Sequence, residues 1–303
     1  MKPNIRLTLL SLAVMLFSGT VLAADPAKPI KHSFLAAGGH TRIVAEDGSA
    51  TWNYPASTRD GWILRNGNRL LALSKSKDFP GGGFVELNPK GDVLAKWSGT
   101  QDEVNTVQKL PGGGYMVTEA GRNPRILELD RTLKIVAEIP MLCQVTNFHM
   151  QSRMARKLDN GNYLVPQLLD KVVREYDKKG HVVWEAKTPN WAFTAIRLPN
   201  GNTLVGCTYG NVVVEFNPKG EIIWQVSNDD LPGKPIKDAC GVQRLPNGNT
   251  VITSYGSKPG EIRLTEVNRD RQIVWTHTDQ QPNGIHHFQI LTTNGRKVRQ
   301  VLK

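Results

Sequence analysis

The stretch that decides the fold is residues 196–224, IRLPNGNTLVGCTYGNVVVEFNPKGEIIW. A second copy begins as VQRLPNGNTVI at Val242 and ends at Trp275, and weaker copies keep only the first turn. The glycine of that turn recurs every 40 to 48 residues, at Gly67, Gly113, Gly161, Gly201, Gly248 and Gly295. A fixed period of this length is typical of stacked supersecondary units.

Each repeat divides into four short strands. In the best copy these are residues 195–198, 203–207, 212–216 and 221–226, which are rich in β-branched side chains and bounded by turn residues. The Asn-Gly pair between the first two strands predicts a type I′ hairpin turn, and NPKG between the last two predicts a proline turn. Four antiparallel strands per repeat predict one blade of a β-propeller.

A tryptophan closes the pattern on the fourth strand of five repeats, at Trp52, Trp97, Trp184, Trp224 and Trp275. A row of exposed rings for stacking on sugars is one interpretation of such a series. The fixed place in the repeat favours the other interpretation, in which each ring fills the gap between neighbouring blades.

The repeats add up to an all-β, six-bladed β-propeller of four-stranded antiparallel blades. Five blades are expected at 62–97, 107–139, 152–187, 194–227 and 241–277. The sixth pairs the N-terminal run 32–54 with the C-terminal run 285–291, which closes the ring and leaves no free sheet edge. Residues 297–303 could add another strand, but residues 33–38 compete for that place.

The first residues are expected to be a signal peptide. Lys2 and Arg6 precede an apolar run at 7–17 that is too short to span a bilayer, and small residues follow at 21–23. We therefore expect cleavage after Ala23, a single propeller domain over residues 24–303, no membrane span and a periplasmic or secreted location.

The chain has a net charge of +11, of which Lys2 and Arg6 contribute two positive charges. Outside the cytoplasm this charge favours an anionic small molecule, an acidic glycan or an envelope protein as partner, and not nucleic acid. Simple solubility explains it equally well. We expect a monomer. The chain has three cysteines, Cys143, Cys207 and Cys240. An odd number does not indicate a disulfide framework, but it is compatible with one disulfide bond or with buried thiols.

The repeat resembles those of the PQQ-like and arylsulfotransferase-like β-propeller families, whose units also end in an acidic or Asn residue, a glycine turn and a tryptophan. This resemblance implies the blade and leaves the chemistry open. Some members of these families bind a quinone cofactor, some transfer sulfuryl groups through a channel histidine, and many only bind partners. No cofactor sequence accompanies the repeat here, so we expect no quinone.

Candidate site residues follow from the repeat, because propellers bind small ligands where the first strand of each blade begins. The fifth residue before the leucine of each first turn gives a polar ring of Arg59, Asn105, Arg153, Phe193, Cys240 and His286. Residues next to this ring add Asp60, His149, Trp191, Asp238 and His287. We expect these side chains at the mouth of the central channel.

Three interpretations of this ring stay open. An anion site would hold its ligand by Arg59 and Arg153, with His149, His286 or His287 as general base or nucleophile if the protein is an enzyme. The other residues predicted to bind the ligand are Asp60, Asn105, Trp191 and Asp238. A divalent metal site would use these histidines with Asp238 or Glu103, or carboxylate and amide oxygens alone. The third interpretation is a polar channel that binds only water. We expect binding of an anionic small molecule, glycan or partner, with an enzyme of the sulfuryl transferase, lyase or lactonase type as the alternative.

Overall fold

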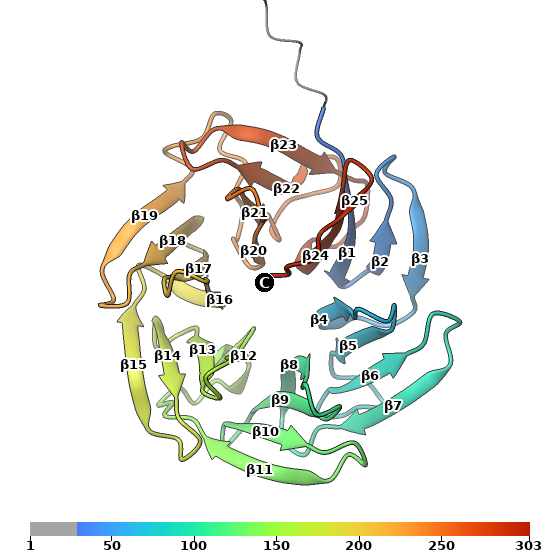
Figure 1. Ribbon diagram of the computed structural model, residues 1–303, viewed down its shortest axis with the longest axis vertical. Helices are drawn as coiled ribbons and strands as arrows, with labels where there is room; N and C mark the ends of the chain where they lie inside the picture. Colours follow the sequence, from blue (N-terminus) through green and yellow to red (C-terminus); the bar gives the residue numbers. More distant parts are fainter. Residues whose placement is uncertain (1–28) are drawn as a thin grey trace, which may run out of the picture.

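The computed structural model describes residues 29–303, which form six antiparallel sheets arranged in a ring around a central axis (Figure 1). This confirms the prediction of an all-β, six-bladed propeller. The expected signal peptide, residues 1–23, lies outside the described residues. In the part of the chain that the structure describes, no helix is long and apolar enough to cross a membrane.

Blades 1 to 5 follow one another along the chain, each with its strands in sequence order. Blade 1 contains β4 (Thr58–Ile63), β5 (Arg69–Leu73), β6 (Gly83–Leu87) and β7 (Val93–Ser98). Blade 2 contains β8 (Glu103–Lys109), β9 (Tyr115–Ala120), β10 (Arg125–Leu129) and β11 (Ile135–Pro140). Blade 3 contains β12 (Arg156–Lys157), β13 (Tyr163–Gln167), β14 (Val172–Tyr176) and β15 (Val182–Lys187). Blade 4 contains β16 (Trp191–Arg197), β17 (Thr203–Thr208), β18 (Val212–Phe216) and β19 (Ile222–Ser227). Blade 5 contains β20 (Val242–Arg244), β21 (Thr250–Thr253), β22 (Ile262–Val267) and β23 (Ile273–Thr278).

Blade 6 joins the two ends of the described chain, as the sequence predicts. Strand β24 (Ile285–Thr293) is its innermost long strand and pairs antiparallel with β1 (His32–Gly38), which is followed by β2 (Thr41–Val44) and β3 (Ala50–Tyr54). The short strand β25 (Arg296–Lys297) pairs with the other edge of β24. The two segments that the sequence analysis set against each other therefore lie on opposite edges of β24. Residues 33–38 take the second place of the blade, and Lys297 belongs to the short fifth strand.

The first strand of several blades begins earlier than predicted. Strands β4, β8 and β16 begin at Thr58, Glu103 and Trp191, whereas the sequence pattern places their starts at 62, 107 and 194. The residues added to β4 and β8 are mostly polar, so hydrophobic alternation does not reveal them, whereas β16 adds Trp191, Ala192 and Phe193. Most of these residues pair with the neighbouring strand. These extensions carry the candidate site residues toward the channel mouth.

The first turns of blades 1 to 5 differ from the prediction of a type I′ turn, whereas that of blade 6 matches it. Asn294 and Gly295 of blade 6 both have a positive φ, of 48° and 77°, as type I′ requires. In blade 4 only the glycine has a positive φ, which is 85° at Gly201, and Asn200 stays outside the left-handed region. The Gly201 amide donates to the Leu198 carbonyl at 2.9 Å, and the Leu198 amide donates to the Asn202 carbonyl at 2.8 Å. This is a type I turn followed by a glycine bulge. Pro199 explains it, because proline fixes φ near −65° at a position where type I′ needs a positive value.

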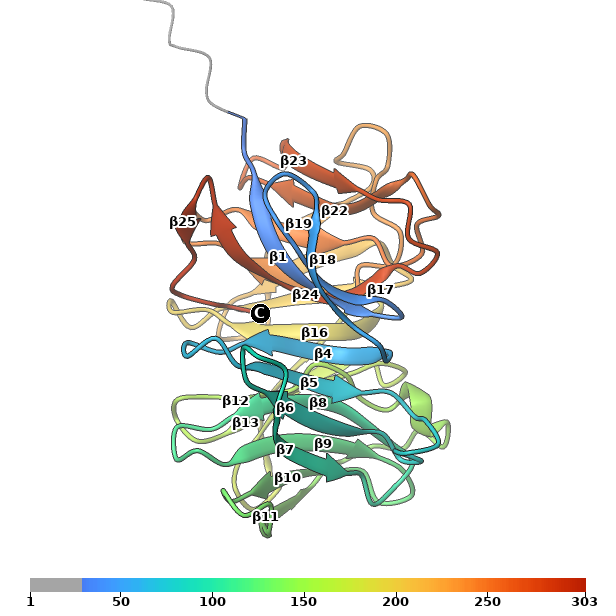
Figure 2. The same cartoon turned by 90° about the vertical axis from the view of Figure 1, so that its right-hand side faces the viewer.

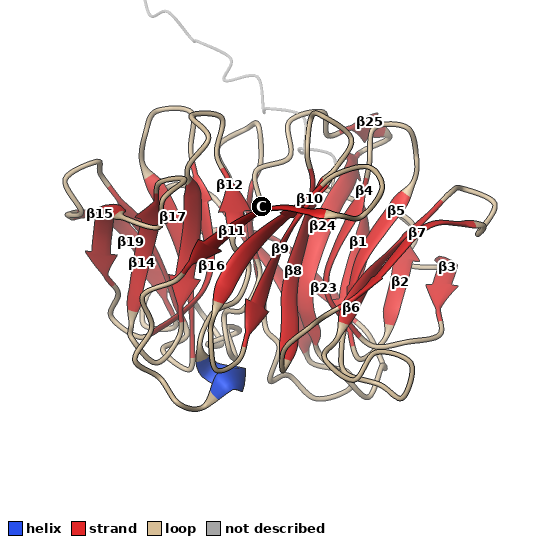
Figure 3. Cartoon of the chain, turned by 90° about the horizontal axis from the view of Figure 1, so that it is seen from below, coloured by secondary structure: helices blue, strands red, loops and turns tan. Residues whose placement is uncertain are grey.

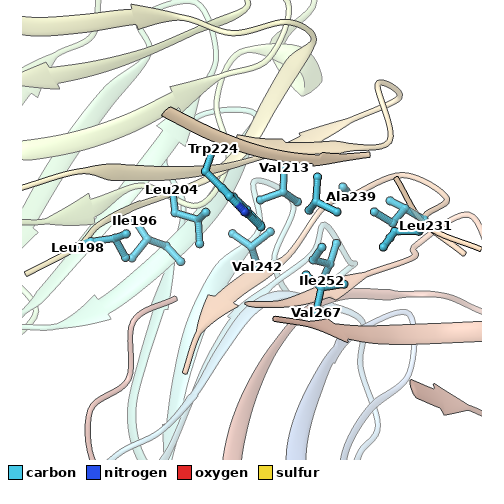
Figure 4. Packing of buried hydrophobic residues seen from close by; sticks show 12 residues of the cluster. Ile196, Leu198, Leu204, Val213, Trp224, Leu231, Ala239, Val242, Ile252 and Val267 are labelled. Carbon is cyan, nitrogen blue, oxygen red and sulfur yellow. The ribbon is translucent and has the colours of Figure 1, made fainter. Parts of the chain in front are cut away.

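The tryptophans of the fourth strands pack between blades, as predicted. Trp224 of β19 is 8% exposed and lies in a cluster with apolar side chains of blades 4 and 5 (Figure 4). Its Nε1 donates to the Arg269 carbonyl of blade 5 at 2.9 Å, and the Arg269 guanidinium lies 4.8 Å from its ring centroid. At this interface the tryptophan ring therefore packs against apolar side chains and is also stacked by a cation.

The two faces of the ring differ. The short 3-10 helix η1 (Phe148–Met150) lies at one face, and β25 lies at the opposite face (Figure 3). The chain after β25 runs back into the ring and ends near its centre (Figures 1 and 2). On the way, the Leu302 carbonyl accepts a hydrogen bond from the Arg244 amide at 3.0 Å, which ties this segment to β20.

Candidate functional site

A cavity of about 380 Å³ lies at the channel mouth on the face of η1. It is bounded by the starts of the first strands and by the loops between second and third strands of blades 4 and 5. Its charged, imidazole and aromatic lining consists of Arg59, His149, Arg153, Phe193, Tyr209, Asp238, Tyr255 and His286.

The structure brings seven of the residues predicted at the channel mouth together at this cavity: Arg59, His149, Arg153, Phe193, Asp238, Cys240 and His286. Trp191 lies beside it, with its ring centroid 4.6 Å from that of Tyr209 in an edge-on contact. Asp60, Asn105 and His287 are fully buried and do not line the cavity.

Arg153 is the most unusual of these residues. It is 2% exposed, and within residues 29–303 its side chain forms a single hydrogen bond, from Nη1 to the neighbouring Ser152 carbonyl at 2.8 Å. Its guanidinium lies 5.7 Å from the Phe193 ring centroid and forms no ion pair with any residue between 29 and 303. Burial, together with the charge of Arg59, lowers the pKa of Arg153 to about 9. In residues 29–303 no carboxylate lies within ion-pair distance of this buried guanidinium, and the charge of Glu103 offsets only part of the lowering of its pKa.

Arg59, in contrast, is paired. Its Nη2 donates to Glu103 Oε1 at 2.9 Å, and His149 Nδ1 donates to the same oxygen at 2.9 Å. Burial raises the pKa of Glu103, but the hydrogen bond from His149 and the charge of Arg59 outweigh it and hold that pKa at about 2. Glu103 is therefore ionised at neutral pH and neutralises Arg59.

His286 has a defined tautomer. Its Nδ1 lies 3.2 Å from the Arg59 carbonyl oxygen, which can only accept, so Nδ1 carries the proton and Nε2 is an acceptor. The ring packs edge-on against Phe193 and Tyr255, at centroid distances of 4.6 and 5.2 Å. Burial, followed by the charges of Arg59 and Arg153, lowers the pKa of His286 to about 3. The imidazole is neutral at pH 7.

Asp238 adopts a left-handed backbone conformation, with a φ of 58°, that non-glycine residues seldom adopt. Its amide donates to Asn211 Oδ1 at 2.7 Å, and its carbonyl accepts from the amides of Cys240 and Tyr255 at 2.8 and 3.2 Å. The carboxylate accepts one long hydrogen bond, from the Tyr209 amide at 3.3 Å, and forms no ion pair in the described part of the chain. These contacts hold a second unpaired charge at the cavity.

Deeper in the channel, Asp60 is the centre of a buried network. It accepts from Arg156 Nη1 at 2.9 Å, from Thr106 Oγ1 at 2.7 Å and from Lys303 Nζ at 3.2 Å. Lys303 also donates to the Gly61 carbonyl at 2.6 Å and to His287 Nδ1 at 3.2 Å. Because all charges here have partners, this network stabilises the channel, and ligand contact by Asp60 and His287 stays a prediction.

Asn105 also lies inside the ring. It is fully buried, and neither its amide oxygen nor its amide nitrogen has a hydrogen-bond partner among residues 29–303. Within the same range, no group of three His, Cys, Asp or Glu side chains is placed to hold a metal ion. A divalent metal therefore stays an untested prediction. Cys143, Cys207 and Cys240 are free thiols, and the last two are buried.

Two cavity residues that the sequence analysis missed are Tyr209 and Tyr255. Each lies in the loop after the second strand of its blade, at the cavity rim. The signal was present, because a Tyr-Gly pair follows that strand in both blades, as CTYGN at 207–211 and TSYGS at 253–257. These residues lie outside the starts of the first strands, where the sequence analysis placed the site.

Replacing Glu103 with glutamine should change how stability depends on pH. The folded-state pKa of about 2 lies below the ordinary value of 4.5, so Glu103 contributes stability above pH 4.5 that is lost as the pH falls through 2. In urea denaturation, the cost of Glu103→Gln should be roughly 2 kcal/mol larger at pH 7 than at pH 3. Glu138→Gln, which removes an exposed partner of Arg125, is the control and should show little such change. Equal costs of Glu103→Gln at both pH values would contradict this assignment.

No family model matches the sequence, and no curated protein matches it either. Among solved structures, a protein of unknown function from Bacteroides caccae is similar, with 22% identity and a TM-score of 0.75 over 89% of this chain and 100% of that one. A catalytically inactive histidine-to-alanine variant of virginiamycin B lyase from Staphylococcus aureus, solved with quinupristin, has 12% identity and a TM-score of 0.58 over 88% and 94% of the two chains. A streptogramin B lyase has 12% identity and a TM-score of 0.57 over 91% and 94%. At these identities the similarity shows the β-propeller fold and does not single out the PQQ-like or arylsulfotransferase-like families.

Proposed function

We propose that this protein binds a small organic anion at the channel mouth, with Arg153 as the principal contact. The observation that carries the proposal is the Arg153 guanidinium, which lines the cavity, is 2% exposed and has no carboxylate partner in residues 29–303. Burying an unpaired charge is strongly unfavourable. An anion in the cavity would supply the counter-charge through charge-assisted hydrogen bonds.

The cavity favours a small molecule over the other partners that the charge suggests. Its volume of about 380 Å³ lies within the range of small-molecule pockets. Phe193, Tyr255 and the apolar side chains of Met150 and Leu168 offer surface for a ligand's carbon skeleton. The neutral His286 offers Nε2 as an acceptor for a hydroxyl or amine. With the signal peptide expected at residues 1–23, the proposed setting is the periplasm or the exterior.

The test uses 3-phenylpropanoate as the probe in isothermal titration calorimetry. Arg153→Gln should weaken binding by about 1–3 kcal/mol, which is about 5- to 150-fold, because the ligand carboxylate loses a charged donor. The control is Arg122→Gln, which removes an equal charge from an exposed site away from the cavity. Thermal melts of the variants show whether both are folded. Unchanged affinity in folded Arg153→Gln, or equal losses in both variants, would overturn the proposal.

An enzyme is the second candidate, and the observation that favours it is the fixed tautomer of His286. With Nδ1–H donating to a backbone carbonyl, Nε2 is placed to take a proton from a bound ligand, as a lyase-type reaction would require. Some proteins of similar fold are named as lyases, which agrees with this candidate function, but the evidence for it is the tautomer of His286. A pKa of about 3 makes His286 a weak base, so binding is the better supported function.

The measurement that decides between them is the pKa of His286 with 3-phenylpropanoate bound, followed by nitrogen-detected NMR. A catalytic base should shift toward about 6 when the anion neutralises the nearby arginine charge, since efficient bases titrate near the working pH. A pKa that stays near 3 in the complex would remove the enzymatic candidate and leave the binding function.

A further inference from the structure

The cavity contains one unpaired charge of each sign. Arg59 is neutralised by Glu103, but Arg153 and Asp238 form no ion pair in residues 29–303. Both line the same space of about 380 Å³ and form no ion pair with each other. A site for a plain anion would gain nothing from a carboxylate in its wall, because like charges repel.

The position of Asp238 is held by several contacts. Its strained backbone is fixed by hydrogen bonds to Asn211, Cys240 and Tyr255, and the Tyr209 amide contacts its carboxylate. Residues in sparsely populated conformations persist where the surroundings determine them, and they are frequent at ligand sites. Tyr209 and Tyr255 also line the cavity beside it, so an ammonium group at Asp238 would have a carboxylate and aromatic rings as neighbours.

We infer that the ligand is a zwitterion of the amino-acid type, with its carboxylate at Arg153 and its ammonium group at Asp238. This inference rests on the proposed anion-binding function and adds to it a positively charged group on the ligand. The apolar side chain of the ligand lies against Phe193, Met150 and Leu168, which supply the apolar part of the wall. The arrangement disfavours phosphate monoesters, because their second negative charge would lie near Asp238.

The test compares three probes that share one ring: L-phenylalanine, 3-phenylpropanoate, which lacks the ammonium group, and 2-phenylethylamine, which lacks the carboxylate. By calorimetry, the unmodified protein should bind L-phenylalanine at least tenfold more tightly than either of the others. Asp238→Asn should weaken the binding of L-phenylalanine about tenfold, and 3-phenylpropanoate should bind this variant as tightly as the unmodified protein or more tightly. Asparagine suits the test because it tolerates the left-handed conformation at this position. Arg153→Gln should weaken the binding of both ligands that carry a carboxylate, L-phenylalanine and 3-phenylpropanoate.

Asp229→Asn is the matched control, because it removes the same charge from a side chain that is 92% exposed in the preceding loop. It should leave all three affinities unchanged. If 3-phenylpropanoate binds as tightly as L-phenylalanine and Asp238→Asn changes neither, the zwitterion inference fails while the anion-binding function stands. If 2-phenylethylamine binds most tightly, or no carboxylate binds, the proposed function fails as well.

Discussion

Replacing Asp60 with asparagine is expected to lower the free energy of unfolding by about 3–5 kcal/mol. Asp60 is fully buried and is the shared anion for Arg156 Nη1, at 2.9 Å, and Lys303 Nζ, at 3.2 Å. Asparagine can keep some hydrogen bonds but not the charge. Arg156 would then be left buried without a counter-charge, and Lys303, whose pKa burial already lowers to about 7, would lose the anion that helps it keep its proton.

The network around Asp60 should also affect how the free energy of unfolding depends on pH. Burial raises the pKa of Asp60, but the charges of Arg156 and Lys303 outweigh it and hold that pKa well below its usual range. A carboxyl group with a depressed pKa contributes stability above its unfolded-state pKa, and this contribution is lost as the pH falls. Asp60→Asn should therefore be least destabilising in acid.

Urea denaturation of Asp60→Asn and of a control measures the effect. The control is Asp102→Asn, which removes the same charge from a half-exposed ion pair with Lys75 and should cost less than about 1 kcal/mol. A cost of Asp60→Asn no greater than that of the control would show that the Asp60 network does not stabilise the ring.

The second large effect is expected for Trp224→Ala, at about 3–5 kcal/mol. The ring is 8% exposed and fills the interface between blades 4 and 5, among Leu204, Val242 and Ile252 (Figure 4). Alanine would leave a cavity between two rigid sheets that cannot collapse to fill it. The Arg269 carbonyl and guanidinium would also lose their partner.

Ile223→Ala is the matched control for this prediction. Ile223 is the neighbouring residue on the same strand, but it is 51% exposed, so its truncation should cost less than about 1 kcal/mol. Thermal or urea unfolding of both variants gives the comparison. Similar costs for the two would mean that the tryptophans do not hold the blades together.

The repeat made most of the fold predictable. The glycine turns fix where hairpins form, and the tryptophans fix which face meets the next blade, so the number of blades and the closing of the ring follow from spacing alone. In blade 4 the predicted turn type was wrong because the Asn-Gly pair was considered without Pro199, whose fixed φ decides the geometry, whereas Asn294-Gly295, with no proline before it, has the two positive φ values of type I′.

The channel network was not predictable, because it depends on contacts between residues far apart that stand outside the repeat. Asp60 is 96 residues from Arg156 and 243 residues from Lys303. No pattern in the sequence shows that the C-terminal segment turns back into the ring. Asp60 and His287 therefore look like mouth residues in the sequence, although Arg156 and Lys303 surround them in the structure.

The candidate site was predictable in position but not in charge balance. Counting from the turn leucines places Arg59, Arg153 and His286 at one mouth, where the structure has them. The sequence cannot show that Glu103 of the next blade neutralises Arg59 while Arg153 stays unpaired. This difference comes from side-chain placement across blades, and it is the feature on which the proposed function depends.

The most direct test of that function is a crystal structure of the protein with 3-phenylpropanoate. We predict that the ligand occupies the channel-mouth cavity, with a carboxylate oxygen about 2.7–3.2 Å from a guanidinium nitrogen of Arg153 and its ring against Phe193. A ligand bound elsewhere on the protein, or one in the cavity whose carboxylate does not contact Arg153, would contradict the account.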